Sequence, residues 1–242
     1  MSRNLWVIRA APILLAGWFV FPLKAHSQEE GDVIPQLWVD YNPAITLSDR
    51  WRLEGDMGVR TEFEENLWWR VIVRPGVRYS LSQSVSLGGG VGSFYTLNKE
   101  FADRLEVRPW QGVRVVWPRW RIPLRHFFRV EERFDFNTES WSLRASLRIR
   151  YRLGLEYRWG ALVRRDRYWR VMLEGELFKT LAGDQGQFRE NVRVGVGVER
   201  SFRRERRLLG EVVWQQRGLF FDLRREVNDI YVRIRVFQRW GL

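Results

Sequence analysis

The segment from Trp141 to Trp159 alternates strictly between two kinds of side chain. Every odd position carries an apolar or aromatic residue, and every even position carries arginine, serine, glutamate or glycine. A helix, which repeats every 3.6 residues, would mix the two kinds on each of its faces, whereas a strand, which repeats every two, separates them. The pattern therefore predicts a long β-strand with one apolar face and one charged face.

The same alternation recurs along the chain. It is clean near 52–60, 69–79, 192–199 and 229–236, and less clean near 36–46, 85–97, 104–117, 124–136, 168–179 and 206–217. Turn-like sequences such as Ser48-Asp49 and Gly183-Asp184 separate the runs. No convincing amphipathic helix follows the N-terminal segment. The sequence thus predicts an all-β, antiparallel fold.

Two all-β arrangements fit alternating strands. A soluble sandwich buries its apolar faces between two sheets, whereas a membrane barrel turns them to lipid. Large aromatic residues sit at the ends of the predicted strands, as Trp69 with Tyr79 and Trp141 with Trp159 show. Aromatic rings favour the boundary between bilayer and water, so pairs at both strand ends indicate two girdles. We therefore expect an antiparallel transmembrane β-barrel.

The N-terminus has the layout of an export signal. Arg3 and Arg9 precede an apolar stretch, and Ala25-His26-Ser27 fits a cleavage site. The apolar stretch is too short to span a bilayer comfortably as a helix. We expect residues 1–27 to be a cleaved signal peptide and 28–242 to form the barrel in the outer membrane of a Gram-negative bacterium.

The number of strands is ambiguous in the sequence. Eleven segments alternate, but single-chain bacterial barrels have even numbers of strands. Either a twelfth strand lies near 28–35, or the 36–46 segment lies inside the lumen and ten strands close. The range is ten to twelve, and twelve is favoured. We expect the longer connections to lie at the outer end of the barrel and the shorter ones at the periplasmic end.

The polar faces of the strands must then meet inside the barrel. The chain has a formal net charge of +12, and all but three of its 41 basic residues are arginine. Guanidinium groups suit confined pairing with carboxylates, although codon bias explains an arginine excess equally well. The residues expected to line the lumen are Arg74, Arg78, Glu106, Arg108, Arg129, Glu131, Arg133, Arg148 and Arg150.

This lumen has two interpretations. An arginine–carboxylate network fills it in one, and in the other it is a cationic pore that favours anions. The leading functional prediction is a pore or binding barrel for small anionic solutes. The alternative is a closed structural or lipid-contacting barrel without transport. Glycines at 88–90, 92, 195 and 197 either make room for a pore or permit strand curvature.

Catalysis has little support in the sequence. The chain lacks cysteine, and His126 is the one histidine after the signal segment. A lipid-modifying enzyme that pairs His126 with Ser142 or Ser146 is a minor alternative. His126 is expected on the outer face, and so is Glu132. Because a carboxylate is unfavourable on a face that contacts lipid, we expect a β-bulge near Glu131-Glu132.

No cofactor, metal or nucleic acid is expected. Calcium could bind at the acidic loop Glu62–Glu65, but solvated loop carboxylates explain that sequence as well. Export and inward-facing arginines argue against nucleic-acid binding. The expected partners are outer-membrane lipid, the barrel-assembly machinery during biogenesis and small anionic solutes.

Three segments carry a resemblance to known sequences. They are Arg74-Pro75-Gly76-Val77-Arg78-Tyr79, Glu106-Val107-Arg108-Pro109-Trp110-Gln111-Gly112 and Arg129-Val130-Glu131-Glu132-Arg133-Phe134. With Leu37-Trp38 and the Leu147–Arg150 run, they resemble an uncharacterised bacterial family of unknown function. Its members are predicted outer-membrane β-barrels, so the resemblance implies the same fold over most of the chain. It implies no activity and no catalytic residue.

Overall fold

The computed structural model describes the chain in seven stretches, namely residues 33–62, 68–117, 122–159, 167–183, 191–203, 205–217 and 227–241. The signal-peptide prediction for residues 1–27 lies outside these stretches. The described residues contain no helix of the length and apolar character that a membrane crossing requires.

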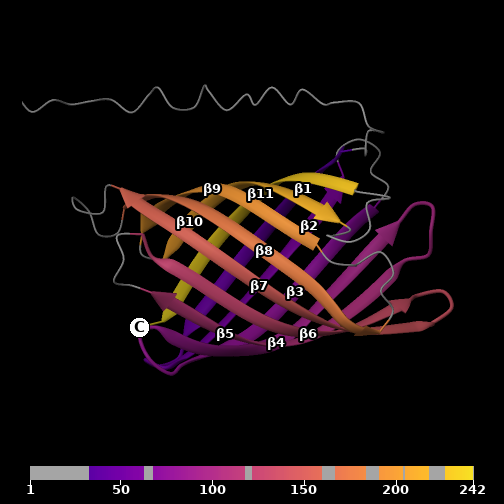
Figure 1. Ribbon diagram of the computed structural model, residues 1–242, viewed down its shortest axis with the longest axis horizontal. Coiled ribbons are helices and arrows are strands. Elements are labelled where there is room, and N and C mark those ends of the chain that lie inside the picture. The colour runs from indigo at the N-terminus through magenta and orange to yellow at the C-terminus, as the bar shows by residue number, and fades with distance from the viewer. Residues whose placement is uncertain are drawn as a thin grey trace, which may run out of the picture. The chain divides into compact units, whose positions relative to one another are not determined.

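Eleven strands make up the described residues (Figure 1). They are β1 (Val33–Thr46), β2 (Trp51–Glu62), β3 (Trp68–Ser80), β4 (Val85–Asn98), β5 (Arg104–Trp117), β6 (Leu124–Asn137), β7 (Leu143–Trp159), β8 (Trp169–Gly183), β9 (Asn191–Arg203), β10 (Arg206–Arg217) and β11 (Val227–Gly241). Consecutive strands pair antiparallel, and β1 pairs with β11 to close a barrel. The all-β prediction and the positions of the alternating runs are confirmed.

The favoured number of twelve strands is wrong. After an odd number of alternating strands the first and last run in the same direction, and β1 and β11 pair in parallel from Val33↔Asn228 to Thr46↔Gly241. A parallel ladder satisfies the backbone groups of both edges, so closure needs no further strand. Residues 33–46 are a wall strand, which also rules out the placement of 36–46 inside the lumen.

Side-chain bonds reinforce this parallel seam from the inside. Asp40 accepts a hydrogen bond from Arg233 at 2.5 Å, and Asn42 accepts one from Arg235 at 3.0 Å. Gln36 donates to Asp229 at 3.2 Å. The inner face of the seam is therefore held by polar groups as well as by the backbone ladder.

The two ends of the barrel differ in their connections. One end, here the short-turn end, holds the turns 47–50 and 81–84, the connections 118–123, 160–168 and 204–205, and the last residues of β11. The other, the long-loop end, holds the connections 63–67, 99–103, 138–142, 184–190 and 218–226 and the start of β1. At the short-turn end three connections have two to four residues, but 118–123 has six and 160–168 has nine, whereas the connections at the long-loop end have five to nine.

The strands turn most of their apolar side chains outward. On β3, Trp69 and Val73 are 46% and 47% exposed, whereas Ile72 between them is fully buried. The inner face instead buries charge, with Glu199 and Asp40 almost without exposure. The core of this molecule is therefore a polar lumen, and the apolar surface lies outside.

The expected bulge at Glu131-Glu132 is absent. Glu132 pairs in regular register with Leu147 and stays exposed on the outer face. The nearby register shift lies instead on the β7–β8 ladder, between Leu147 and Arg148. Glu132 therefore keeps its outward position without a change of register.

Candidate functional site

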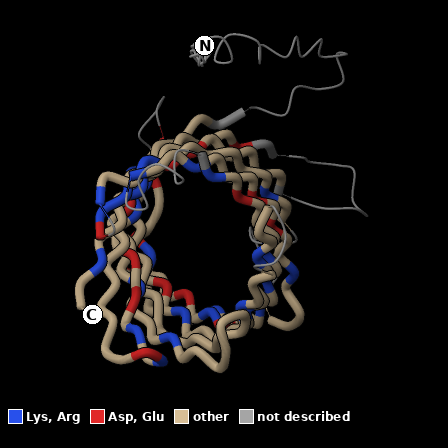
Figure 2. The backbone as a smooth tube through the Cα atoms, turned by 90° about the vertical axis from the view of Figure 1, so that its left-hand side faces the viewer, with Lys and Arg blue, Asp and Glu red and all other residues tan. Residues whose placement is uncertain are grey.

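One cavity of about 960 Å³ occupies the lumen. Its lining includes Asn98 and Phe101 at the long-loop end and Gln238 and Arg239 at the short-turn end. Figure 2 looks along the barrel and shows charged residues around the whole ring of strands. Among the described residues, the cavity thus extends from one end of the barrel to the other.

The charge on this lining is unbalanced. Twenty arginines and ten carboxylates of the described chain line the cavity. Four further carboxylates are buried in the inner wall, namely Asp40, Glu131, Glu156 and Glu199. The arginines still outnumber all of these carboxylates, so the lumen is cationic.

Two carboxylates organise the arginines of β5, β6 and β7. Glu131, 2% exposed, contacts Arg148 and lies 3.2 Å from Arg129 and 3.6 Å from Arg150. Glu106 holds Arg108 and Arg133, each at 2.5 Å. Buried ion pairs repay their desolvation only when several hydrogen bonds satisfy the charge, as they do here.

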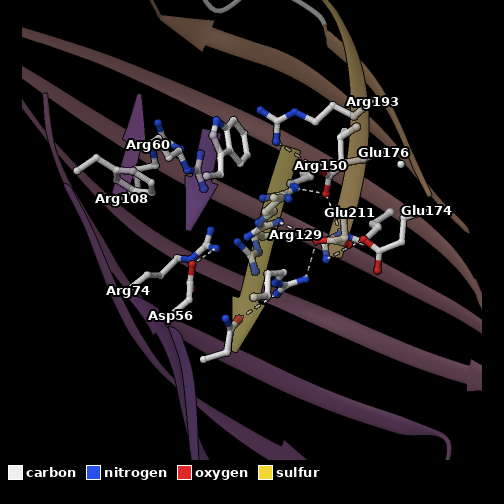
Figure 3. A pocket seen from close by; sticks show the side chains of 18 of the residues that line it. Asp56, Arg60, Arg74, Arg108, Arg129, Arg150, Glu174, Glu176, Arg193 and Glu211 are labelled. Carbon is white, nitrogen blue, oxygen red and sulfur yellow. Dashed lines mark hydrogen bonds and ion pairs between the residues drawn. The ribbon is translucent and has the colours of Figure 1, made fainter. Parts of the chain in front are cut away.

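A second group of ion pairs lines β7 to β9. Glu176 contacts Arg150 and lies 2.9 Å from Arg152 and 3.6 Å from Arg193. In Figure 3, Glu174, Glu176 and Glu211 lie on the side of β8 and β10, while Arg60, Arg74 and Arg108 extend from β2, β3 and β5.

Aromatic faces hold other arginines without neutralising them. The Arg60 guanidinium lies 3.6 Å from the centre of the Trp38 ring, whose own centre is 3.6 Å from that of Tyr231. The guanidinium of Arg129 lies 4.2 Å from the Trp110 ring centre. Such stacking fixes a guanidinium but leaves its charge. Arg60 makes no ion pair within the described part of the chain.

Trp110 explains a part of the glycine cluster. A Cβ added to Gly76 would lie 2.8 Å from the Trp110 ring, and one added to Gly90 would lie 3.0 Å from its Nε1. Glycines here let the indole lie flat against β3 and β4. The space they provide is filled by Trp110 and is not part of an open passage.

The nine predicted lumen residues all lie on the inner face. Seven of them line the cavity, and Glu131 and Arg133 are buried behind it in the ion pairs with Arg148 and Glu106. Sequence reasoning did not single out Trp38, Asp40 and Arg60. These residues follow the alternation of their strands. Inward Trp38 and outward Val39 are both apolar, however, so the sequence alone does not show which of the two faces the lumen.

The proposed histidine–serine pair does not form. His126 Nδ1 lies 2.9 Å from the Tyr151 hydroxyl, and its ring neighbours are Trp117 and Tyr151. Ser146 pairs with Arg133, seven residues along β6 from His126, which is roughly 23 Å at 3.3 Å per residue. His126 keeps its outward strand position, at the edge of the cavity.

No metal site is built by the described residues. They contain no group of three histidine or acidic side chains arranged to hold an ion. Of the loop Glu62–Glu65, only Glu62 is described, and it accepts a hydrogen bond from Trp68 Nε1. The remaining residues of that calcium hypothesis lie outside the described stretches.

Fold and lumen together define a closed, eleven-stranded β-barrel protein with an arginine-rich interior. A family model described as "Protein of unknown function (DUF2490)" matches residues 35–239, which run from β1 to β11. The chain belongs to this family, and the match confirms the resemblance to a family of unknown function over most of the chain. No curated protein and no solved structure matches the chain.

Proposed function

We propose that this protein spans the bacterial outer membrane and passes small anionic solutes through its lumen. The observation that carries the proposal is the lumen cavity, which among the described residues reaches both barrel ends and is lined by twice as many arginines as carboxylates. A ring of fixed positive charge lowers the entry barrier for anions and raises it for cations.

The outer surface supports a membrane location. Exposed aromatic residues crowd the short-turn end, at Trp51, Trp117, Tyr157, Trp169 and Trp240, where Tyr79 is half-buried, and others lie toward the long-loop end, at Trp69, Tyr95 and Trp214. Trp69 and Tyr79 are ten residues apart on β3, which is roughly 25 Å of height for a strand tilted by about 40°. This height matches the apolar band of outer-membrane barrels.

The size of the lumen supports a small solute. A cavity of about 960 Å³ lies at the upper end of the range of small-molecule sites. Residues 1–27 would direct export, the short-turn end would face the periplasm, and the barrel-assembly machinery and outer-membrane lipid would be the partners. The proposal includes no catalytic step, cofactor or nucleic acid.

Planar bilayers test the proposal. The refolded mature chain should give discrete conductance steps, and a tenfold gradient of potassium chloride should give a reversal potential of the sign set by chloride. Arg60→Gln should reduce the anion preference, because it removes an uncompensated charge from the lining, whereas Arg206→Gln at the rim serves as the charge-matched control. Cation preference, or equal effects of the two variants, would contradict an arginine-controlled passage.

A second candidate is the closed structural or lipid-contacting barrel without transport. The dense ion pairs around Glu131 and Glu176 favour it, because interlocked side chains resist the passage of solutes. Absence of conductance from protein that is shown to be folded and inserted would select this candidate. Folding as a monomer in buffer without detergent would overturn both.

A further inference from the structure

The short-turn end of the lumen concentrates arginines that few carboxylates balance. Seven of them line the cavity there, including Arg170, and we name the other six the mouth cluster: Arg52, Arg78, Arg114, Arg125, Arg207 and Arg239. They extend from six different strands, β2, β3, β5, β6, β10 and β11. The cluster therefore surrounds the passage and does not follow one wall.

The ion pairs of the mouth cluster are shared or missing. Glu54 is the common partner of Arg78 and Arg114, the latter at 3.6 Å. Arg52 lies directly opposite Arg78 in the β2–β3 ladder. In the described part of the chain, Arg52 and Arg239 make no ion pair. One carboxylate thus serves Arg78 and Arg114, and the neighbouring Arg52 has no carboxylate partner of its own in the described part of the chain.

The other two members compete for carboxylates with a third arginine. Arg125 lies 2.9 Å from Glu156, and Arg207 lies 3.3 Å from Glu199. Arg170 binds both of these carboxylates, at 2.6 and 2.5 Å. The negative charge on this side of the mouth is therefore largely committed to Arg170.

The cluster also contains donors without acceptors. Among the described residues, the buried Nε atoms of Arg52, Arg78 and Arg125 have no hydrogen-bond partner. Arg78 has Arg52, Arg114, Arg125 and Arg239 within electrostatic reach. Like charges on opposed strand positions destabilise a sheet, and buried donors without acceptors are costly. An anion with several acceptor atoms at the centre of the cluster would relieve both penalties.

We infer that the mouth cluster binds a compact, multiply charged oxyanion, namely phosphate or the phosphate group of a small ester. The inference rests on the proposed function, since the solute must reach the lumen. Guanidinium forks match phosphate oxygens in bidentate pairs. A phosphate dianion offers acceptors to Arg52, Arg78 and Arg114 at once, which chloride cannot do. The passage thus has an anion-binding site at its short-turn end.

Calorimetry on the detergent-solubilised full-length mature chain tests the inference. Titration with inorganic phosphate should give saturable binding that an equal concentration of chloride does not reproduce. Arg52→Gln should weaken this binding about tenfold or more, the effect of losing one charge-assisted hydrogen bond. Glycerol 3-phosphate, as a second titrant, distinguishes the two sources: tighter binding than phosphate indicates an ester, and weaker binding indicates the free ion.

Two further variants keep the test decisive. Arg200→Gln removes the same charge near the same end, but its guanidinium stacks over Trp169, 4.7 Å from the ring centre, and it should leave phosphate binding unchanged. Glu54→Gln should strengthen binding about threefold, because it releases Arg78 and Arg114. Equal affinities of Arg52→Gln and Arg200→Gln would overturn the inference. If Arg52→Gln does not fold, unchanged or weaker binding by Glu54→Gln would do so.

The assay separates this inference from the proposed function. Binding is measured in micelles and needs no current across a bilayer. Phosphate binding by a barrel that does not conduct would refute passage and leave the mouth cluster as an anion site. Conductance with no saturable phosphate binding would refute the mouth site alone.

Discussion

Removal of the Glu131 carboxylate tests whether ion pairs hold the inside of the barrel. Glu131 is 2% exposed and is the shared partner of Arg148, Arg129 and Arg150. Glu131→Gln keeps the size of the side chain but leaves Arg148 and Arg129 without their carboxylate, while Arg150 keeps Glu176 as a partner. Breaking a buried pair by removing one partner costs about 3–5 kcal/mol, and we expect a loss within this range.

Guanidinium chloride unfolding of the refolded barrel in detergent gives the free energy of unfolding. Glu139→Gln is the matched control, because Glu139 is an exposed turn residue, and its loss should change that free energy by less than about 0.5 kcal/mol. Glu131→Met combined with Arg148→Met should recover a part of the loss, with a coupling of about 0.5–3 kcal/mol. A loss below about 1 kcal/mol for Glu131→Gln would refute a stabilising role for the network.

Three further predictions concern the wall and the export of the chain. Gly90→Ala should destabilise the barrel by about 1–3 kcal/mol in the same unfolding assay, because its Cβ would lie 2.3 Å from the Pro75 carbonyl oxygen, whereas Gly175→Ala, with open space around it, should be neutral. An equal effect of both would contradict the close packing of Trp110. Val196→Arg, at an outward position of β9 that is 52% exposed, should reduce folding into lipid vesicles by about 2–4 kcal/mol, and Val196→Ile should not; an unaffected arginine variant would argue against a lipid-facing wall. Mass spectrometry of protein from isolated outer membranes should show Gln28 as the first residue, and retention of Met1 would refute cleavage.

Periodicity was sufficient to predict the strands, since a period of two leaves few other solutions. The runs near 69–79 and 141–159 became β3 and β7 with their apolar faces outward. Strand number was harder, because alternation describes each strand alone and says nothing about how the two edges meet. The expectation of an even count excluded a parallel pair between β1 and β11, which the structure contains.

The sequence predicted which face of each strand lines the lumen, but not which residues contact one another there. Alternation places Arg129 and Arg148 inside, but which carboxylate each arginine contacts depends on strand register, which the sequence does not state. The Trp38–Tyr231 stack joins two strands from opposite ends of the chain. Trp110 is equally instructive, because its indole lies against Gly76 of β3 and against the β4 glycines that the sequence analysis assigned to a pore or to strand curvature.

The parallel seam also has a consequence for how the polypeptide reaches its native state. The three side-chain bonds that cross it join residues 193 positions apart, whereas the other ladders join neighbouring hairpins. Local hairpins form quickly, and distant pairings carry the largest entropic cost and arise last. Until β1 and β11 pair with each other, both strands expose unpaired backbone amides and carbonyls. A catalyst of membrane insertion that shields these two strands would therefore act at the slowest stage of biogenesis.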